Sequence, residues 1–470
     1  MLDRSLPSRK DGDGDLVNQS SEMVPHHLGE TRERAQSDVS SAGTTSSPGS
    51  STAYVWYVVG LLSLVNLFSY MDRTALSVLL PSIKADLQLK DGQLGLLVGF
   101  AFFLFYATCG IPIARLADRS VRKNMIAIAL VVWSAMAALS GAAQNFWHLL
   151  LARMGLGAGE AGCVPAGQSI ISDYVGINQR STALAINTCG MSVGTMSGLI
   201  AAGWLGEIFG WRWAFVLLAL PGVLVAIIVW TTLIEPVRGA IDGLEHDQTG
   251  GSMREALRSL WECRTYRRVV IFFIMSGFAN AGLSQWWPSF YSRVFDLSLS
   301  SMGIGLGTAI GVGSAIGTIL GAVLTHRAMQ RDVKSPLLIA SAAMFLAIPA
   351  AFGSLFVPSA SGSMLLASLT FLLWAIPSGP ITATIYNVTK PRMRATASAC
   401  TIFLMSILGF GLGPLCVGVL SDLFAASFGV EALRYALLLP ASVLAGLCVA
   451  LYMVAQSLPH DLKAAGIRVT

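Results

Sequence analysis

Residues 54–81 read YVWYVVGLLSLVNLFSYMDRTALSVLLP, an apolar run that contains one adjacent pair of charges, Asp72 and Arg73. At 1.5 Å per residue, about 20 apolar residues cross the hydrocarbon core of a membrane, so the run predicts a spanning helix. The charged pair would then lie well inside the hydrocarbon, where an ionised side chain is costly and marks a functional site by default.

Similar apolar runs recur along most of the chain. Of the 470 residues, 54% are hydrophobic and only 12% are charged, whereas soluble domains carry about 25% charged residues. This composition excludes soluble enzymes and nucleic-acid binders. It predicts an all-α integral membrane protein with twelve transmembrane helices in two pseudo-symmetric six-helix bundles. The other eleven runs lie near 93–116, 124–143, 147–174, 180–204, 213–234, 268–293, 301–325, 336–357, 363–389, 394–421 and 432–456.

The chain divides into five predicted parts. Residues 1–53 are polar and rich in serine, which predicts a disordered tail. A polar connection at 236–265 contains SMREALRSLWECRTYRR, whose spacing predicts an amphipathic helix on the membrane surface. On either side lie a six-helix bundle at 54–235 and another at 266–458, and a second short tail follows at 459–470. The runs RSTALA at Arg180 and RATASA at Arg394 suggest that the bundles are repeats.

The basic residues predict the orientation. With the N-terminus inside, the inner connections hold 17 Lys and Arg and the outer ones hold five. Because inner connections are enriched in these residues, both termini are expected to be cytoplasmic.

Four ionisable residues remain well inside the spans: Asp72, Arg73, Arg153 and Glu160. Arg153 and Glu160 are seven residues apart and share a helix face, at depths that bracket the Asp72–Arg73 pair. We expect all four to face one cavity, with Asp72 and Glu160 carrying protons, because carboxyl groups withdrawn from water exchange protons near neutral pH. An internal set of ion pairs that locks spans one and four together is the alternative interpretation.

In the second bundle, aromatic side chains are the candidate substrate contacts in place of buried charges. Trp286, Trp287 and Trp374 are candidates for an aromatic wall around the apolar part of a substrate, and Arg73 and Arg153 are the candidates for binding its anionic part. Trp286 and Trp287 equally suit a role as anchors at the membrane interface.

The segment ARLADRSVRK at 114–123 resembles the signature loop of the major facilitator superfamily, although Ala114 and Val121 stand where that loop has glycine. RMGLGAGEA at 153–161 also resembles this superfamily. Together with NLFSYMDR at 66–73, the GEAG run at 159–162 is similar to the Spinster-like branch, whose members are linked to lysophospholipid and sphingolipid export. The organic anion:cation symporters share part of this pattern.

The resemblance also implies a cytoplasmic gate that breaks when the bundles rock. The alternative is that its basic residues only fix the topology. The gate residues are expected to be Asp118, Arg119, Arg122, Lys123, Asp173, Arg180 and Arg394.

The sequence therefore predicts a proton-coupled secondary active transporter that works by alternating access on an amphipathic or organic anion such as a lysolipid. A sugar acid or carboxylate:proton symporter and a non-transporting membrane sensor are the alternatives. A membrane-embedded enzyme is disfavoured because none of the six histidines is mid-span, and the seven scattered cysteines imply neither disulfides nor a metal site. The expected partners are the substrate, protons and the bilayer, with no cofactor and no nucleic acid, in a monomer of a bacterial inner membrane.

Overall fold

The computed structural model describes residues 51–237, 253–329, 332–389 and 393–464, and these described residues contain helices but no strands. The first part of the chain forms α2 (Thr52–Leu87), α3 (Asp91–Gly95), the π-helix η1 (Leu96–Phe100), α4 (Ala101–Arg119), α5 (Arg122–Gly141), α6 (Phe146–Glu160), α7 (Cys163–Tyr174) and α8 (Ile177–Thr232). The second part forms α9 (Met253–Glu262), α10 (Arg264–Phe295), α11 (Leu299–Met329), α12 (Ser335–Phe356), α13 (Ala360–Ala375), α14 (Ser378–Val388), α15 (Arg394–Leu404), the π-helix η3 (Met405–Gly411), α16 (Leu412–Phe428), the short η4 (Gly429–Glu431) and α17 (Ala432–Ala464).

The predicted all-helical membrane fold is confirmed. Within the described residues, nine stretches are long and apolar enough to cross a membrane. The stretch Gln179–Thr232 is long enough for two crossings and bends at Gly210. The φ of Gly210 is 77°, a backbone conformation that glycine adopts without strain. Thr396–Lys463 likewise holds two crossings on either side of η4, and the α6–α7 pair supplies one more. This arrangement accommodates the twelve expected spans.

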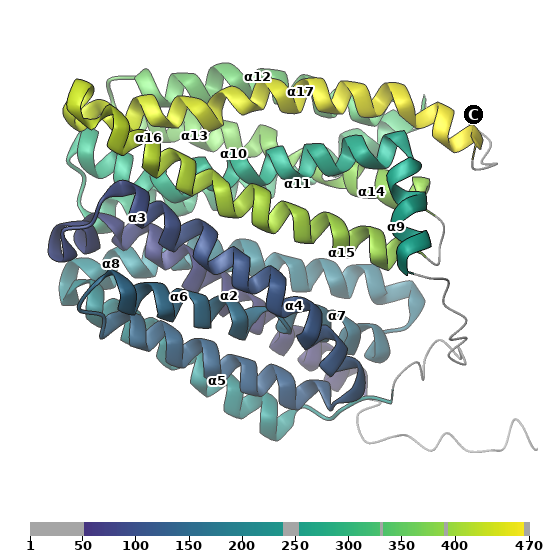
Figure 1. Ribbon diagram of the computed structural model, residues 1–470. Coiled ribbons are helices and arrows are strands. Elements are labelled where there is room, and N and C mark those ends of the chain that lie inside the picture. Colours follow the sequence, from purple (N-terminus) through teal and green to yellow (C-terminus); the bar gives the residue numbers. More distant parts are fainter. Residues whose placement is uncertain (1–50, 238–252, 330–331, 390–392, 465–470) are drawn as a thin grey trace, which may run out of the picture. The chain divides into compact units, whose positions relative to one another are not determined.

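Large apolar side chains cover the outside of the helices. Leu365, Leu423 and Ile319 are each about two-thirds or more exposed, at 72%, 67% and 67%. Such a surface is stable in lipid, where the hydrocarbon tails are as apolar as leucine. The helices α2 to α7, purple to blue in Figure 1, group together, and the green-to-yellow helices α10 to α17 form a second group.

Spans four and ten are each interrupted near the middle. The first break follows Glu160, between α6 and α7, and the second follows Ala375, between α13 and α14. Arg180 and Arg394 lie 214 positions apart, and the same offset takes Glu160 to Trp374. The two breaks therefore occupy corresponding positions of the two predicted repeats, and interrupted helices in such positions commonly surround the binding site of membrane proteins built from repeats.

The helix α9 lies where the sequence predicts an amphipathic helix. Its Leu260 is buried and Trp261 is 55% exposed. Residues 1–50 of the expected tail and much of the connection at 236–265 lie outside the described residues, so the five-part division stays a prediction.

Candidate functional site

Glu160 holds Arg73 at the centre of the first bundle. Arg73 Nε donates to Glu160 Oε2 at 2.6 Å, and Ser69 Oγ donates to the same oxygen at 2.8 Å. The Glu160 side chain is fully buried, at the end of α6 where span four breaks. Among the described residues, Glu160 Oε1 and Arg73 Nη2 have no hydrogen-bond partner. The pair is thus only partly satisfied, and a proton or a ligand can complete it.

Aromatic rings surround the Arg73 guanidinium. Its carbon lies 4.9 Å from the ring centroid of Tyr70, 5.0 Å from that of Phe102 and 4.7 Å from that of Tyr106. Cation–π attraction stabilises the charge without using up its N–H donors. This cage fixes the group on α2 while the donors stay available.

Arg153 and Asp72 complete the charged cluster. Arg153 is 2% exposed, its guanidinium lies 5.9 Å from the centroid of Phe102, and its Nε and Nη1 have no partner among the described residues. Asp72 is 5% exposed and forms no hydrogen bond or ion pair with another described residue. In this conformation Arg73 thus pairs with Glu160 of span four and not with its neighbour Asp72. The pair is of the kind that the alternative interpretation expects between spans one and four.

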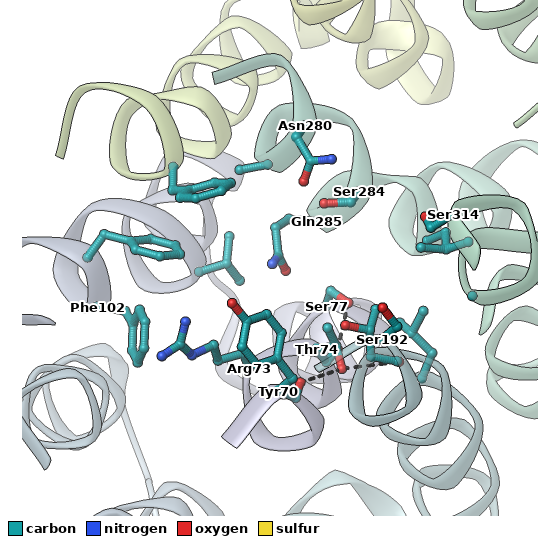
Figure 2. A pocket seen from close by; sticks show the side chains of 18 of the residues that line it. Tyr70, Arg73, Thr74, Ser77, Phe102, Ser192, Asn280, Ser284, Gln285 and Ser314 are labelled. Atoms are coloured by element: carbon teal, nitrogen blue, oxygen red, sulfur yellow. Dashed lines mark hydrogen bonds between the residues drawn. The ribbon is translucent and has the colours of Figure 1, made fainter. Parts of the chain in front are cut away.

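The two arginines line a cavity of about 240 Å³ between the bundles (Figure 2). Asp72 and Glu160 do not line it, so only part of the expected four-residue site faces the cavity. Phe103 and Phe410 also line it, with rings stacked 5.1 Å apart across the bundles. The cavity is thus lined by residues of both halves.

The wall contributed by the second bundle is polar and uncharged. It includes Asn280, Ser284 and Gln285 of α10 and Ser314 of α11. These four side chains form no hydrogen bond within the described part of the protein, and Gln285 Oε1 is buried. The sequence signal for this wall is the four-residue spacing of Ser276, Asn280 and Ser284 on one face of span seven, which our sequence analysis did not use.

A second cavity, of about 250 Å³, adjoins the first. Asn280 and Ser314 line both cavities. The second is lined by aromatic side chains, including Phe371 and Trp374, and it lies at the break between α13 and α14. Trp374 Nε1 donates to Ser276 Oγ at 3.0 Å, which fixes the indole. The structure thus places Trp374 beside a cavity, in the position that corresponds to Glu160.

Trp286 and Trp287 lie elsewhere. Both are fully buried and line neither cavity. Trp286 Nε1 donates to the Pro414 carbonyl at 2.9 Å, and the Trp287 ring packs on Phe371 at 5.3 Å. The expectation that they touch substrate or the membrane interface is corrected: they are packing residues of the second bundle.

An ionic lock joins the bundles at one end. Asp91 accepts hydrogen bonds from both terminal nitrogens of Arg293, at 2.6 and 2.7 Å, from Lys84 at 2.5 Å and from Ser421 at 2.7 Å. Asp422 in turn accepts from the backbone nitrogens of Asp91 and Gly92, at the N-terminus of α3. We call this set the outer lock, because the distribution of basic residues predicts that this end faces the outside. The sequence did not predict the outer lock, because Asp91 lies between two apolar runs and looks like an ordinary loop residue.

The expected gate residue Arg122 is paired, but within its own bundle. Arg122 binds Asp173 at 2.5 Å and Glu235 at 2.7 Å, and the backbone nitrogen of Lys123 donates to Glu235 at 2.9 Å. All of these residues belong to the first bundle, so these contacts do not join the halves. Glu235 was not among the expected gate residues, although it follows span six directly.

The hydrogen bonds described for the remaining expected gate residues lie within their own bundles. Arg180 donates to the Ser172 carbonyl, Arg394 donates to the Tyr386 carbonyl, and Arg119 is exposed. The side chain of Asp118 lies outside the described part. Between described residues, hydrogen bonds and ion pairs across the bundles occur only at the end of the outer lock, where Ser300 also donates to Glu207.

Comparisons with known proteins agree with this architecture. A sequence model of the Major Facilitator Superfamily matches residues 62–414. An MFS-type efflux pump of Mycolicibacterium smegmatis is 32% identical over 386 residues, 82% of this chain and 88% of the pump. The helix breaks and the central cavity are thus accompanied by a direct family match, and the chain belongs to the Major Facilitator Superfamily.

Within the superfamily the chain is a transporter of the Spinster-like branch, as the sequence resemblance predicts. Protein spinster homolog 1 of Bos taurus is 27% identical over 400 residues, 80% of this chain and 74% of that protein. The crystal structure of a bacterial homolog of the human lysosomal transporter Spinster, inward-facing and unoccupied, matches with a TM-score of 0.80 at 28% identity. That match covers 87% of this chain and 99% of the homolog. The chain is therefore a multi-pass membrane transporter and not an enzyme.

Proposed function

We propose that this transporter moves an amphipathic organic anion, such as a lysolipid, by alternating access coupled to protons. The single observation that carries the proposal is the junction of two unlike cavities. One contains the unpartnered donors of Arg73 and Arg153, and the other is lined by Phe371 and Trp374. A molecule with an anionic head and an apolar chain fits both at once, because guanidinium donors bind phosphate or carboxylate in two-point geometry.

Proton coupling is proposed through the same arginine. While Glu160 is ionised it competes with the substrate for Arg73. When Glu160 takes a proton its attraction for the guanidinium weakens, and Arg73 becomes free to bind an anion. Asp72 is proposed as a second proton site, because it is buried without an ion-pair partner among the described residues. The mechanism makes proton and anion binding mutually favourable.

A binding experiment separates the amphipathic anion from the sugar-acid alternative. Binding of alkyl phosphates of increasing chain length to the purified full chain is measured against binding of glucuronate. Each buried methylene contributes about 0.8 kcal/mol, or about fourfold in affinity. We expect the affinity to rise with chain length in the native protein and less steeply in Trp374→Ala. Tight glucuronate binding with no dependence on chain length would contradict the proposal.

A further inference from the structure

The wall of α10 between the charged cavity and the aromatic cavity carries polar groups that the mechanism above leaves unused. Asn280, Ser284 and Gln285 lie at positions i, i+4 and i+5 of one helix, so they face the same side. Figure 2 shows the Gln285 amide pointing toward the part of the cavity that holds Tyr70 and Arg73. Neither Asn280, Ser284 nor Gln285 has a hydrogen-bond partner among the described residues.

A buried polar group without a hydrogen-bond partner raises the free energy of the folded protein. A buried acceptor without a hydrogen bond loses about 1–3 kcal/mol relative to a satisfied one. The buried Gln285 Oε1 is such an acceptor, and it faces a cavity rather than packed protein. A site built in this way favours a ligand that brings a donor and rejects the analogue that lacks it.

The charge of the wall limits the class of donor. The cavity residues contributed by α10 and α11 are all uncharged: Asn280, Ala281, Ser284, Gln285, Ile310, Gly311 and Ser314. Without a carboxylate, this side of the cavity suits a neutral hydroxyl better than an ammonium group, which prefers an ionised acceptor.

The side-chain types that line the two cavities change along their length. The arginines come first, the amide and hydroxyl side chains of α10 follow, and the aromatic cavity comes last, with Asn280 lining both cavities. We infer that Asn280, Ser284 and Gln285 form a hydroxyl-recognition subsite, which binds the uncharged hydroxyl that lies between the phosphate and the acyl chain of a glycerol phosphate amphiphile. This inference rests on the proposed function, since it assumes that the two cavities hold one amphipathic anion.

A matched pair of ligands tests the subsite. Dodecanoyl lysophosphatidic acid has a free glycerol hydroxyl, and the corresponding dodecanoyl ester of propanediol phosphate lacks only that group. Equilibrium binding of each is measured on the full chain in nanodiscs of neutral lipid. We expect the native protein to prefer the hydroxylated ligand by about fivefold to tenfold, which is the range of one hydrogen bond.

Two variants and one control locate the preference. In Gln285→Leu we expect weaker binding of the hydroxylated ligand only, so that the preference disappears, and in Ser284→Ala a smaller loss of the same kind. Gln456→Leu, at an exposed position of α17, retains the full preference. Thermal unfolding confirms that each variant is folded, and the small Ser284→Ala change keeps the test valid if Gln285→Leu does not fold.

The outcomes separate the two proposals. Equal binding of the two ligands by the native protein, or equal weakening of both by Gln285→Leu and Ser284→Ala, overturns the subsite while the proposed function stands. Failure of the native protein to bind either ligand overturns the proposed function and the subsite with it.

Discussion

At the scale of single residues, the site combines a firmly held guanidinium with donors that remain free. Glu160 binds Arg73 through Nε alone, and the ring centroids of Tyr70, Phe102 and Tyr106 lie 4.7 to 5.0 Å from the guanidinium carbon. An arginine suits this role because its planar group stacks on rings and stays charged at any physiological pH. In the proposed mechanism the proton is therefore carried by a carboxyl group and not by Arg73.

Replacement of Arg73 by lysine tests the anion-binding role. A lysine keeps the charge but loses the two-point geometry of the guanidinium and its contacts with the three rings. We expect Arg73→Lys to bind an alkyl phosphate about tenfold more weakly, which corresponds to about 1.4 kcal/mol. Titration of the purified variant against the native protein measures this, and unchanged affinity would mean that Arg73 is only a structural partner of Glu160.

Replacement of Glu160 by glutamine tests the coupling. In the native protein, lower pH protonates Glu160 and frees Arg73, so anion affinity is expected to rise as pH falls. The glutamine keeps a carbonyl acceptor for Ser69 and Arg73 but cannot ionise. We therefore expect Glu160→Gln to bind at every pH with roughly the affinity that the native protein reaches only at low pH. Retention of the native pH profile in this variant would exclude Glu160 as the proton carrier.

The sequence was sufficient to find the charged residues but not their pairing. A charge inside an apolar run is conspicuous, and all four such residues are buried or mostly buried together. Whether Arg73 meets Asp72 or Glu160 depends on the rotation of α2 against α6, which no local pattern encodes. For the same reason the sequence did not show that Trp286 and Trp287 face packed protein while Trp374 faces a cavity.

At the scale of helices, close backbone approach holds the outer lock in place. The helix α3 packs against α16, where a Cβ added to Gly418 would lie 2.3 Å from the Asp91 carbonyl oxygen. Two π-helical turns, η1 and η3, lie along the same seam, and a Cβ on Gly99 of η1 would lie 2.6 Å from the Gly411 carbonyl oxygen. Turns of this kind are frequent at functional sites.

A single added methyl group tests this seam. We expect Gly418→Ala to separate α3 from α16 and to destabilise the locked conformation by about 1–3 kcal/mol, as overpacked contacts do. The measurement is the thermal unfolding temperature together with the outer distance described below. Gly60→Ala is the matched control, because a Cβ there meets no atom within 4 Å; an equal effect of both changes would contradict the close-packing argument.

The apolar runs predicted the transmembrane helices but did not predict where spans four and ten are interrupted. Glu160 and Trp374 stand at the ends of broken helices, but Gly and Pro occur throughout spanning segments and give no distinct signal. The correspondence of the two breaks becomes visible only when the helix ends are known. It is then the strongest structural indication of where the substrate binds.

At the scale of the whole protein, the contacts between the bundles are unevenly distributed. Those that involve hydrogen bonds or ion pairs between described residues lie at the outer lock. Loss of the lock should therefore favour opening at that end. Removing one partner of a charge network also leaves the other partner poorly satisfied, which adds to the effect.

Arg293→Gln is the direct test of the lock. Spin labels at Lys90 and Val430, which are both exposed, report the distance between the bundles at this end. We expect a longer and broader distance distribution in Arg293→Gln than in the otherwise identical protein. If the distribution does not change, the Asp91 network is not what keeps this end closed.

In the proposed transport cycle, an amphipathic anion and a proton share Arg73 and Glu160. The most direct test uses proteoliposomes with an imposed pH gradient, in which movement of a fluorescent lysophospholipid and of protons is followed together. In the native protein we expect transport that depends on the pH gradient. In Glu160→Gln we expect transport to lose this dependence while substrate binding persists. Lysophospholipid movement that ignores the pH gradient in the native protein would contradict it.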